Sequence, residues 1–221
     1  STTTATFTVS ITAVNDPPTL TTVTTFTGGT EDTPYEITYA QLTANGNEAD
    51  PENDPISFRI DAVSTGTLEK WNGSSWAAVT AGSTMIASSD KVRWTPAANA
   101  NGTLNAFTIS AYDGALYSAS PTQVLVSITA VNDKPVVTAG ANLAYTENGS
   151  AAVIDNTISI TDIDDTKIAS ATVSISAGFL NGDILGFTNQ NGISGNYNAS
   201  TGTLSLTGTA TLAQYQTALR S

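Results

Sequence analysis

Apolar and small polar residues alternate along several short stretches of the chain. This period of two is typical of β-strands with one buried face. It occurs at residues 57–60, 107–111, 172–175 and 203–206, where Thr, Val, Ile, Leu and Phe supply many of the side chains. Asn-Gly, Thr-Gly and Pro separate such stretches along the chain. The pattern therefore predicts an all-β fold, either a sandwich or a barrel.

One stretch near the end of the chain follows a different period. Leu212, Tyr215 and Leu219 have helical spacing. They predict one short helix in an otherwise β protein.

The chain contains an internal repeat. Residues Val9–Asp16 and Val126–Asp133 both read Val-Ser-Ile-Thr-Ala-Val-Asn-Asp, and the two copies lie 117 residues apart. Each copy is an alternating strand that ends in Asn-Asp-x-Pro, a sequence typical of turns. We expect this turn to mark the boundary between repeating units.

The boundary divides the chain into three parts. Residues 1–16 are expected to be the closing strand and linker of a preceding repeat, and residues 17–133 a complete unit. Residues 134–221 are expected to be a second unit that lacks its last strands, because this part is shorter than the first unit.

Composition excludes several classes of function. The chain has 221 residues, 19 acidic and 7 basic, with a net charge of −12 and neither Cys nor His. Disulfides and Cys/His zinc sites are excluded, and nucleic acid is not expected as a partner of so acidic a chain. No apolar run is long enough to insert into a membrane. Without His or Cys a serine nucleophile lacks an evident base, so we expect no enzyme.

The carboxylates gather at the predicted ends of strands. Such groups repel one another unless a cation lies among them, and Ca²⁺ prefers carboxylate, amide and carbonyl oxygens. Asp and Asn also favour turns without any metal. The clusters contain Asp16, Glu31, Asp32, Asp50, Glu52, Asp54, Asp113, Asp133, Glu147, Asp162, Asp164 and Asp165.

The spacing of these acids repeats, which turn propensity does not require. Glu31 follows Asp16 by 15 residues, and Glu147 follows Asp133 by 14. Asp50 follows Asp16 by 34 residues, and Asp162 follows Asp133 by 29. Two units therefore place acids at similar distances from the same Asn-Asp linker.

The chain resembles the cadherin-like tandem repeats of large bacterial surface and secreted adhesins, whose units end in Val-Asn-Asp-x-Pro. The resemblance covers nearly the whole chain and implies tandem Greek-key β-sandwiches of the cadherin or immunoglobulin type. The motifs that carry it are Ala13–Pro18, Asp50–Pro55, Tyr112–Gly114 and Ala130–Pro135, with Tyr145–Asn148, Ile160–Asp165 and Tyr197–Leu206 in the second unit.

The resemblance also implies Ca²⁺ between successive units. Without a disulfide, a cation shared across the linker would convert a hinge into a stiff connection. At the junction within the chain the implied ligands are Glu31, Asn132, Asp133, Asp162 and Asp164, with Asp165, Asn99 and Asn101 as further candidates. At the entrance to the first unit they are Asn15, Asp16, Asp50, Glu52 or Asp54, and Asp113.

The resemblance predicts a calcium-stiffened structural or adhesive segment of a long bacterial protein, extracellular or on the cell surface. Its partners would be Ca²⁺, a cell-surface glycan or protein, or another copy of the chain. One alternative is a carbohydrate- or ligand-binding module that uses Trp71, Trp76 and Trp94. Another is a strand-donating fibre subunit, in which residues 5–14 complete the second unit of the next copy.

Overall fold

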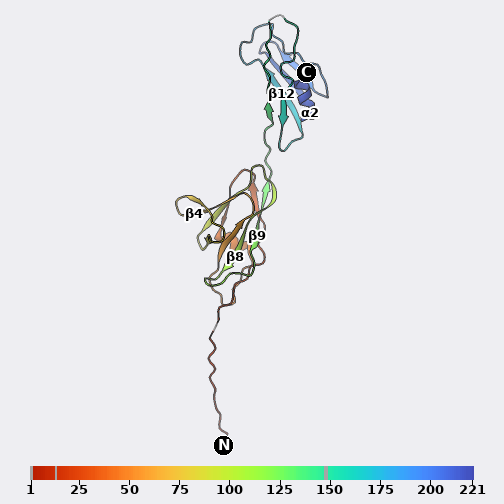
Figure 1. The fold of residues 1–221 in the computed structure, drawn as a ribbon. Helices are drawn as coiled ribbons and strands as arrows, with labels where there is room; N and C mark the ends of the chain where they lie inside the picture. Colours follow the sequence, from red (N-terminus) through yellow and green to blue (C-terminus); the bar gives the residue numbers. More distant parts are fainter. Residues whose placement is uncertain (1, 13, 147–148) are drawn as a thin grey trace. The chain divides into compact units, whose positions relative to one another are not determined.

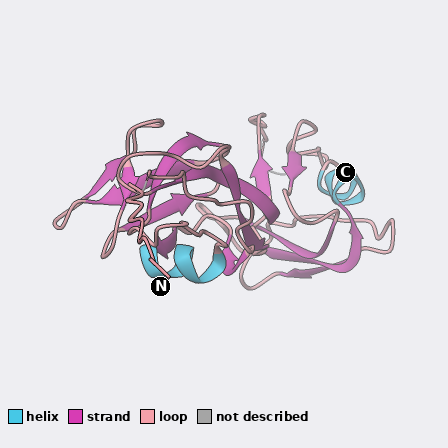
Figure 2. Cartoon of the chain, turned by 90° about the horizontal axis from the view of Figure 1, so that it is seen from below, coloured by secondary structure: helices cyan, strands magenta, loops and turns pink. Residues whose placement is uncertain are grey.

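The computed structural model describes residues 2–12, 14–146 and 149–221. Glu147, which belongs to the repeated acids, lies outside these residues. The chain divides into two compact units, Ser1–Val131 and Asn132–Ser221, and each is described by itself. Strands dominate both units, and each contains one short helix (Figure 2). The described residues contain no helix with the length and hydrophobicity needed to cross a membrane.

The first unit is a sandwich of two sheets. One sheet has the strand order β1-β9-β8-β3-β6 and the other has the order β2-β7-β4-β5. Most neighbours are antiparallel, but β1 runs parallel to β9. The long strands β8 and β9 lie side by side in Figure 1. The strands are β1 (Phe26–Thr30), β2 (Tyr35–Thr38), β3 (Ser57–Val63), β4 (Thr67–Trp71), β5 (Trp76–Ala78), β6 (Met85–Ile86), β7 (Lys91–Thr95), β8 (Gly102–Tyr112) and β9 (Thr122–Thr129).

Alternating side chains of both sheets form the core of this unit. Phe58 and Ile60 of β3, Val92 and Trp94 of β7 and Val126 of β9 are all fully buried. Their polar neighbours along each strand lie closer to solvent, as the period of two predicts. The indole nitrogen of Trp94 donates a hydrogen bond to the carbonyl of Thr65 at 2.7 Å, which satisfies its one polar atom inside the core.

The helix α1 (Tyr39–Asn45) is not anticipated by the apolar pattern. Its N-terminus is a capping box, in which Thr38 accepts from the backbone of Gln41 and the Gln41 side chain accepts from the backbone of Thr38. Leu42 is its one buried side chain. A single anchor leaves no helical periodicity to detect, so only the cap marks this helix in the sequence.

The second unit contains two small sheets and a helix. Its strands are β10 (Val136–Thr138) and β11 (Ser159–Thr161), which pair with each other, and β12 (Lys167–Ser174), β13 (Ser194–Asn198) and β14 (Thr203–Thr211), in the order β12-β14-β13.

The predicted helix near the end of the chain is present as α2 (Leu212–Leu219). It has the same capping box as α1, here formed by Thr211 and Gln214. Tyr215 is fully buried among Ile193, Leu204 and Leu206, and its hydroxyl donates to the carbonyl of Gly208 at 2.7 Å. The helical spacing therefore identified the side chains that face the core.

The described residues of the segment 5–14 pair with no strand of this chain, and the expectation that they close a preceding repeat stays a prediction. Phe7 and Ile11 of this segment are 89% and 87% exposed. The alternation is real, but a strand requires a partner for its backbone hydrogen bonds.

Candidate metal centres

The carboxylate candidates form three groups, and each group is described within its own unit. The entrance cluster consists of Asn15, Asp16, Asp50, Glu52, Asp54 and Asp113; the exit cluster consists of Glu31, Asp32, Asn99 and Asn101; and the second-unit cluster consists of Asn132, Asp133, Asp162, Asp164 and Asp165.

Hydrogen bonds connect most members of the entrance cluster. The side-chain amide of Asn15 donates to Asp113 at 2.9 Å, and the backbone N–H of Asp16 donates to Glu52 at 3.2 Å. Oδ1 of Asp50 accepts the backbone N–H groups of Glu52 and Asp54, each at 2.9 Å. The fold therefore brings together the linker, the Asp50 loop and the loop after β8, the three segments that the resemblance implies for this cluster.

The loop after β8 holds Asp113 as an anion. Its carboxylate accepts the backbone N–H groups of Leu116 and Ala115 and the amide of Asn15. These hydrogen bonds favour the charged form, led by the one from Leu116, and they lower the pKa of Asp113 below its ordinary value. A carboxylate held charged at this position can attract a cation.

The second-unit cluster repeats two features of the entrance cluster. The backbone N–H of Asp133 donates to Asp164 at 2.6 Å, as Asp16 does to Glu52. Oδ1 of Asp162 accepts the backbone N–H groups of Asp164 and Asp165 at 3.0 and 2.8 Å, as Asp50 accepts two in the first unit. Two different loop sequences therefore build the same arrangement.

Asp50 and Asp162, the two aspartates that accept backbone N–H groups of their own loops, share a further property. Oδ2 of Asp50 and Oδ2 of Asp162 are both buried and have no hydrogen-bond partner. In the described residues only one other side-chain atom has this property, Oε2 of Glu48, two residues before Asp50. A buried carboxylate oxygen without a donor is costly, because it has lost water and gained nothing in exchange. A bound cation would compensate that cost at both aspartates, so the residues present fit a metal.

The exit cluster is built around a buried glutamate. Glu31 follows β1 directly and is 3% exposed. One carboxylate oxygen accepts the backbone N–H of Val131, and the other accepts the amide of Asn101 at 3.3 Å. Beside it, Asp32 accepts the backbone N–H of Asn99 at 3.0 Å. Val131 immediately precedes Asn132, so Glu31 binds the last residue before the linker.

Four acids of these clusters take no part in the ion pairs found among the described residues. The four ion pairs of the described residues use Asp61, Asp90, Glu36 and Glu69. None of them includes Glu31, Asp50, Asp113 or Asp162, whose negative charge is therefore available to a cation.

The sequence did not reveal two features of these clusters. The contact between Glu31 and Val131 is made by a backbone N–H, which every residue except proline has, so no residue type in the sequence marks it. The unpartnered oxygen of Glu48 lies outside every motif, although its position two residues before Asp50 is a signal in retrospect. Burial raises the pKa of this glutamate above its ordinary value.

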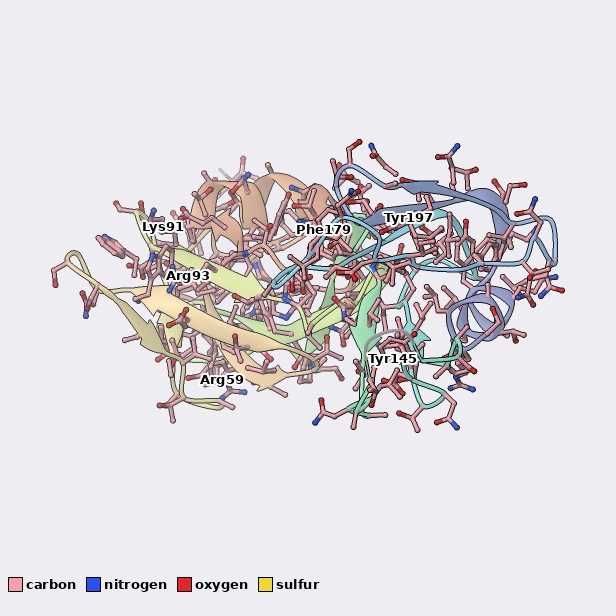
Figure 3. The ribbon with its side chains drawn as sticks, turned by 90° about the horizontal axis from the view of Figure 1, so that it is seen from above. Arg59, Lys91, Arg93, Tyr145, Phe179 and Tyr197 are labelled. Carbon is pink, nitrogen blue, oxygen red and sulfur yellow. The ribbon has the colours of Figure 1, made fainter. Side chains whose placement is uncertain are left out.

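The three tryptophans, which are the candidates for a glycan site, lie in different surroundings. Trp94 is fully buried and cannot contact a ligand. Trp71 and Trp76 form an edge-to-face pair, with 5.3 Å between ring centroids, across the hairpin of β4 and β5. Lys91 and Arg93 of β7, labelled in Figure 3, place their charged groups 5.0 and 4.7 Å from the Trp76 ring centroid. These contacts favour a structural role for the pair.

Comparison with known proteins agrees with the sandwich fold. Residues 15–128, more than half of the chain, match the family described as bacterial Ig domain. The chain is 37% identical over 101 residues to halomucin of Haloquadratum walsbyi, a match that covers 43% of this chain and 1% of halomucin.

Among solved structures, domains 5–6 of the S-layer protein SbsC are similar at 12% identity, over 89% of this chain and 86% of that one. The TM-score of 0.24 is too low for this likeness to carry an argument. The family match extends from the Asn15–Asp16 linker almost to the end of β9, the whole of the first sandwich. The chain belongs to the bacterial Ig domain family.

Proposed function

We propose that this chain is a spacing and stiffening segment of a long extracellular or cell-surface protein, and that Ca²⁺ bound at its carboxylate clusters braces consecutive units. The bacterial Ig domain family and the similarity to halomucin support a structural role rather than an enzymatic one. Adhesion through a glycan, a protein or a second copy of the chain is part of the same proposal.

One observation carries the calcium proposal. Asp50 and Asp162 occupy equivalent loops. In each, one carboxylate oxygen accepts two backbone N–H groups, and the other oxygen is buried without a donor. Turn formation explains the hydrogen bonds of the first oxygen, but it does not explain why the second oxygen is buried without a donor. An unsatisfied oxygen at the same place in two units supports the same kind of ligand, a cation, at each of them.

The chemistry of the donors selects the kind of cation. The clusters offer carboxylate and amide oxygens and contain no nitrogen or sulfur ligand, which suits Ca²⁺ better than a transition metal. When bound, Ca²⁺ would supply positive charge to several oxygens at once. Asp50 and Asp162 would direct one oxygen each to it, and their bonds to backbone N–H groups would keep the loops in place.

Stiffening would follow from the position of the clusters along the chain. Glu31 binds Val131 on one side of the Asn132–Asp133 linker, and Asp164 binds the backbone of Asp133 on the other side. Both sides of the linker are therefore already tied to a carboxylate. We propose that a cation held by these carboxylates would limit rotation about the linker.

Thermal unfolding in excess Ca²⁺ and in excess chelator tests the proposal. Extracellular modules bind Ca²⁺ with Kd on the order of 10⁻⁴–10⁻³ M. At about 10 mM Ca²⁺ each site would then stabilise the folded chain by about 1.4–2.7 kcal/mol. For a unit of about 100 residues this corresponds to a rise in melting temperature of roughly 5–20 °C.

Asp50→Asn and Asp162→Asn are the variants of choice, because Asn retains the oxygen that caps the loop. Each should keep its melting temperature in chelator and lose most of the rise in Ca²⁺. Asp61→Asn serves as a matched control, because Asp61 pairs with Arg59 outside the clusters. Equal melting temperatures of the unaltered chain in Ca²⁺ and in chelator would refute calcium binding.

A further inference from the structure

A hollow with several polar side chains lies at one side of the first sandwich. It is found between the β4–β5 hairpin of one sheet and the segment that carries β6, the edge strand of the other sheet. Its volume of about 610 Å³ is within the range of small-molecule sites. All the residues that line it lie between positions 70 and 90, so it is formed within the first unit. Its lining includes Lys70, Asn72, Ala77, Thr84, Ser89 and Asp90.

An ion pair supplies the charged groups of this lining. Nζ of Lys70 donates to Oδ2 of Asp90 and to the carbonyl of Met85, each at 2.7 Å. The side chains of Lys70 and Asp90 are 29% and 27% exposed, so a ligand can reach both. A lysine ammonium has three donors, which leaves one N–H of Lys70 for a ligand. Oδ1 of Asp90 has no hydrogen-bond partner among the described residues and can accept one.

Ser89 occupies a backbone position that favours glycine. Its φ is +76°, in the left-handed region, at the third residue of a turn in which the N–H of Asp90 donates to the carbonyl of Ala87 at 2.9 Å. The other described non-glycine residues with positive φ are all Asp or Asn, which tolerate this conformation. The Ser89 hydroxyl has no hydrogen-bond partner in the described part of the chain. Folding of the turn therefore does not explain why a serine stands here.

The chemistry of these three groups selects a class of ligand. Lys70 offers a donor, Asp90 offers an acceptor, and the Ser89 hydroxyl can be either. Because the ammonium and the carboxylate lie 2.7 Å apart, an anion would be repelled by Asp90 and a cation by Lys70. Neighbouring hydroxyls of a sugar ring are uncharged and close together, and each can both donate and accept. The N–H and C=O groups of a peptide are spread along its chain, and each has only one of these roles.

We propose that this hollow binds a neutral saccharide, whose hydroxyls contact the Ser89 hydroxyl, the Lys70 ammonium and the Asp90 carboxylate. The small side chain of Ala77 leaves room for a sugar ring. The proposal rests on the adhesive part of the proposed function, to which it assigns one kind of partner and a place. It does not depend on calcium, because no lining residue belongs to the carboxylate clusters.

Nuclear magnetic resonance of the isotope-labelled chain tests this site. The probes are the neutral trisaccharides cellotriose, mannotriose and triacetylchitotriose, each titrated to about 20 mM. At least one of them should shift the backbone N–H signals of residues 70–90 in a saturable manner and leave the signals of the second unit unchanged. The neutral peptide acetyl-Ala-Ser-Ala-amide serves as the comparison and should cause no saturable shift.

Ser89→Gly separates binding from folding. Glycine removes the hydroxyl and suits the positive φ, so the melting temperature should stay the same or rise. The Kd for the saccharide should rise by about 10-fold, because a hydrogen bond to the ligand is lost. Ser88→Gly is the matched control, because Ser88 belongs to the same turn but does not line the hollow, and it should leave the Kd unchanged. Ala77→Leu should abolish binding by filling the hollow.

The proposal is overturned by the absence of a saturable shift with all the trisaccharides, by a Kd that Ser89→Gly leaves unchanged, or by a peptide that binds as tightly as the saccharides. Titrations in Ca²⁺ and in chelator should give the same Kd. Absence of saccharide binding beside an intact calcium-dependent rise in melting temperature would refute this site and leave the calcium proposal standing. Saccharide binding without that rise would support this site and refute calcium binding alone.

Discussion

Glu31 accepts the backbone N–H of Val131, a residue 100 positions further along the chain. The first of these residues follows β1, and the second follows β9, the strand that runs parallel to it. The carboxylate therefore fixes the end of the first unit at the point where the chain enters the linker. Glu31 is 3% exposed, and its other carboxylate oxygen accepts the side-chain amide of Asn101.

We predict that the effect of Glu31→Gln depends on calcium. The substitution removes the charge and keeps the size, but it replaces one of two accepting oxygens by an NH₂ donor, so in chelator it should lower the free energy of unfolding by about 1–3 kcal/mol. In Ca²⁺ the variant should lose the stabilisation of about 1.4–2.7 kcal/mol that one bound cation provides at about 10 mM.

Urea unfolding followed by tryptophan fluorescence measures this difference. All three tryptophans lie in the first unit, so the signal reports that unit alone. Glu69→Gln is a suitable control, because Glu69 pairs with Arg93 on the outside of a sheet. If Glu31→Gln destabilises the unit equally in both conditions, the glutamate has only a structural role.

A second prediction concerns the tryptophans. Trp94 fills the centre of the first core, so Trp94→Ala should destabilise that unit by about 3–5 kcal/mol through the cavity it leaves. Trp71→Ala removes one half-exposed ring from a pair worth about 0.5–1.5 kcal/mol, and should cost no more than that.

Chemical denaturation followed by circular dichroism compares the two variants. Trp76→Ala is the matched control for Trp71→Ala, because it breaks the same ring pair from the other strand. A cost for Trp71→Ala as large as that for Trp94→Ala would mean that the pair belongs to the core.

The strands in which apolar and polar residues alternate were predictable from the sequence. Phe58 and Ile60 follow the period of two and are buried as expected. The helix α2 was found because Leu212, Tyr215 and Leu219 all contact the core. The helix α1 was missed because Leu42 alone is buried.

The equivalence of the Asp50 and Asp162 loops was predictable from the sequence, and their hydrogen-bond geometry was not. Repeated spacing from the Asn-Asp linker identified Asp50 and Asp162, which do take equivalent positions. The sequence cannot show which oxygen of a carboxylate is buried or lacks a donor, since that depends on the packing of the surrounding loops. The same limit applies to Trp94, whose burial separates it from the other two tryptophans.

The helix caps lead to a third prediction. Thr38 and Thr211 each accept a backbone N–H in the first turn of a short helix. Thr38→Ala and Thr211→Ala should each destabilise the unit that contains them by about 1 kcal/mol. Thr→Ser at the same positions keeps the hydroxyl and should cost much less, so a Ser variant as unstable as the Ala variant would show that the methyl group matters instead.

The last prediction concerns acid unfolding of the second unit. The buried carboxylate of Asp155 accepts the hydroxyl and backbone N–H of Thr157, at 2.6 and 2.7 Å, and the backbone N–H groups of Gly140 and Ala141. These hydrogen bonds, led by the Thr157 hydroxyl, hold the pKa of Asp155 far below its ordinary value. The folded state therefore binds its proton less tightly than the unfolded state does.

The sign of the pH effect follows from this depressed pKa. The stabilisation by Asp155 is fully present above the unfolded pKa of about 3.9 and is lost as pH falls below it toward the folded pKa. Asp155→Asn should destabilise the unit at pH 7, and its stability should change less between pH 5 and pH 2 than that of the unaltered chain. Circular dichroism reports the unfolding of both units, and tryptophan fluorescence reports that of the first unit alone. The difference between the two signals gives the unfolding of the second unit. Parallel acid profiles for the two proteins would mean that other carboxylates control acid unfolding.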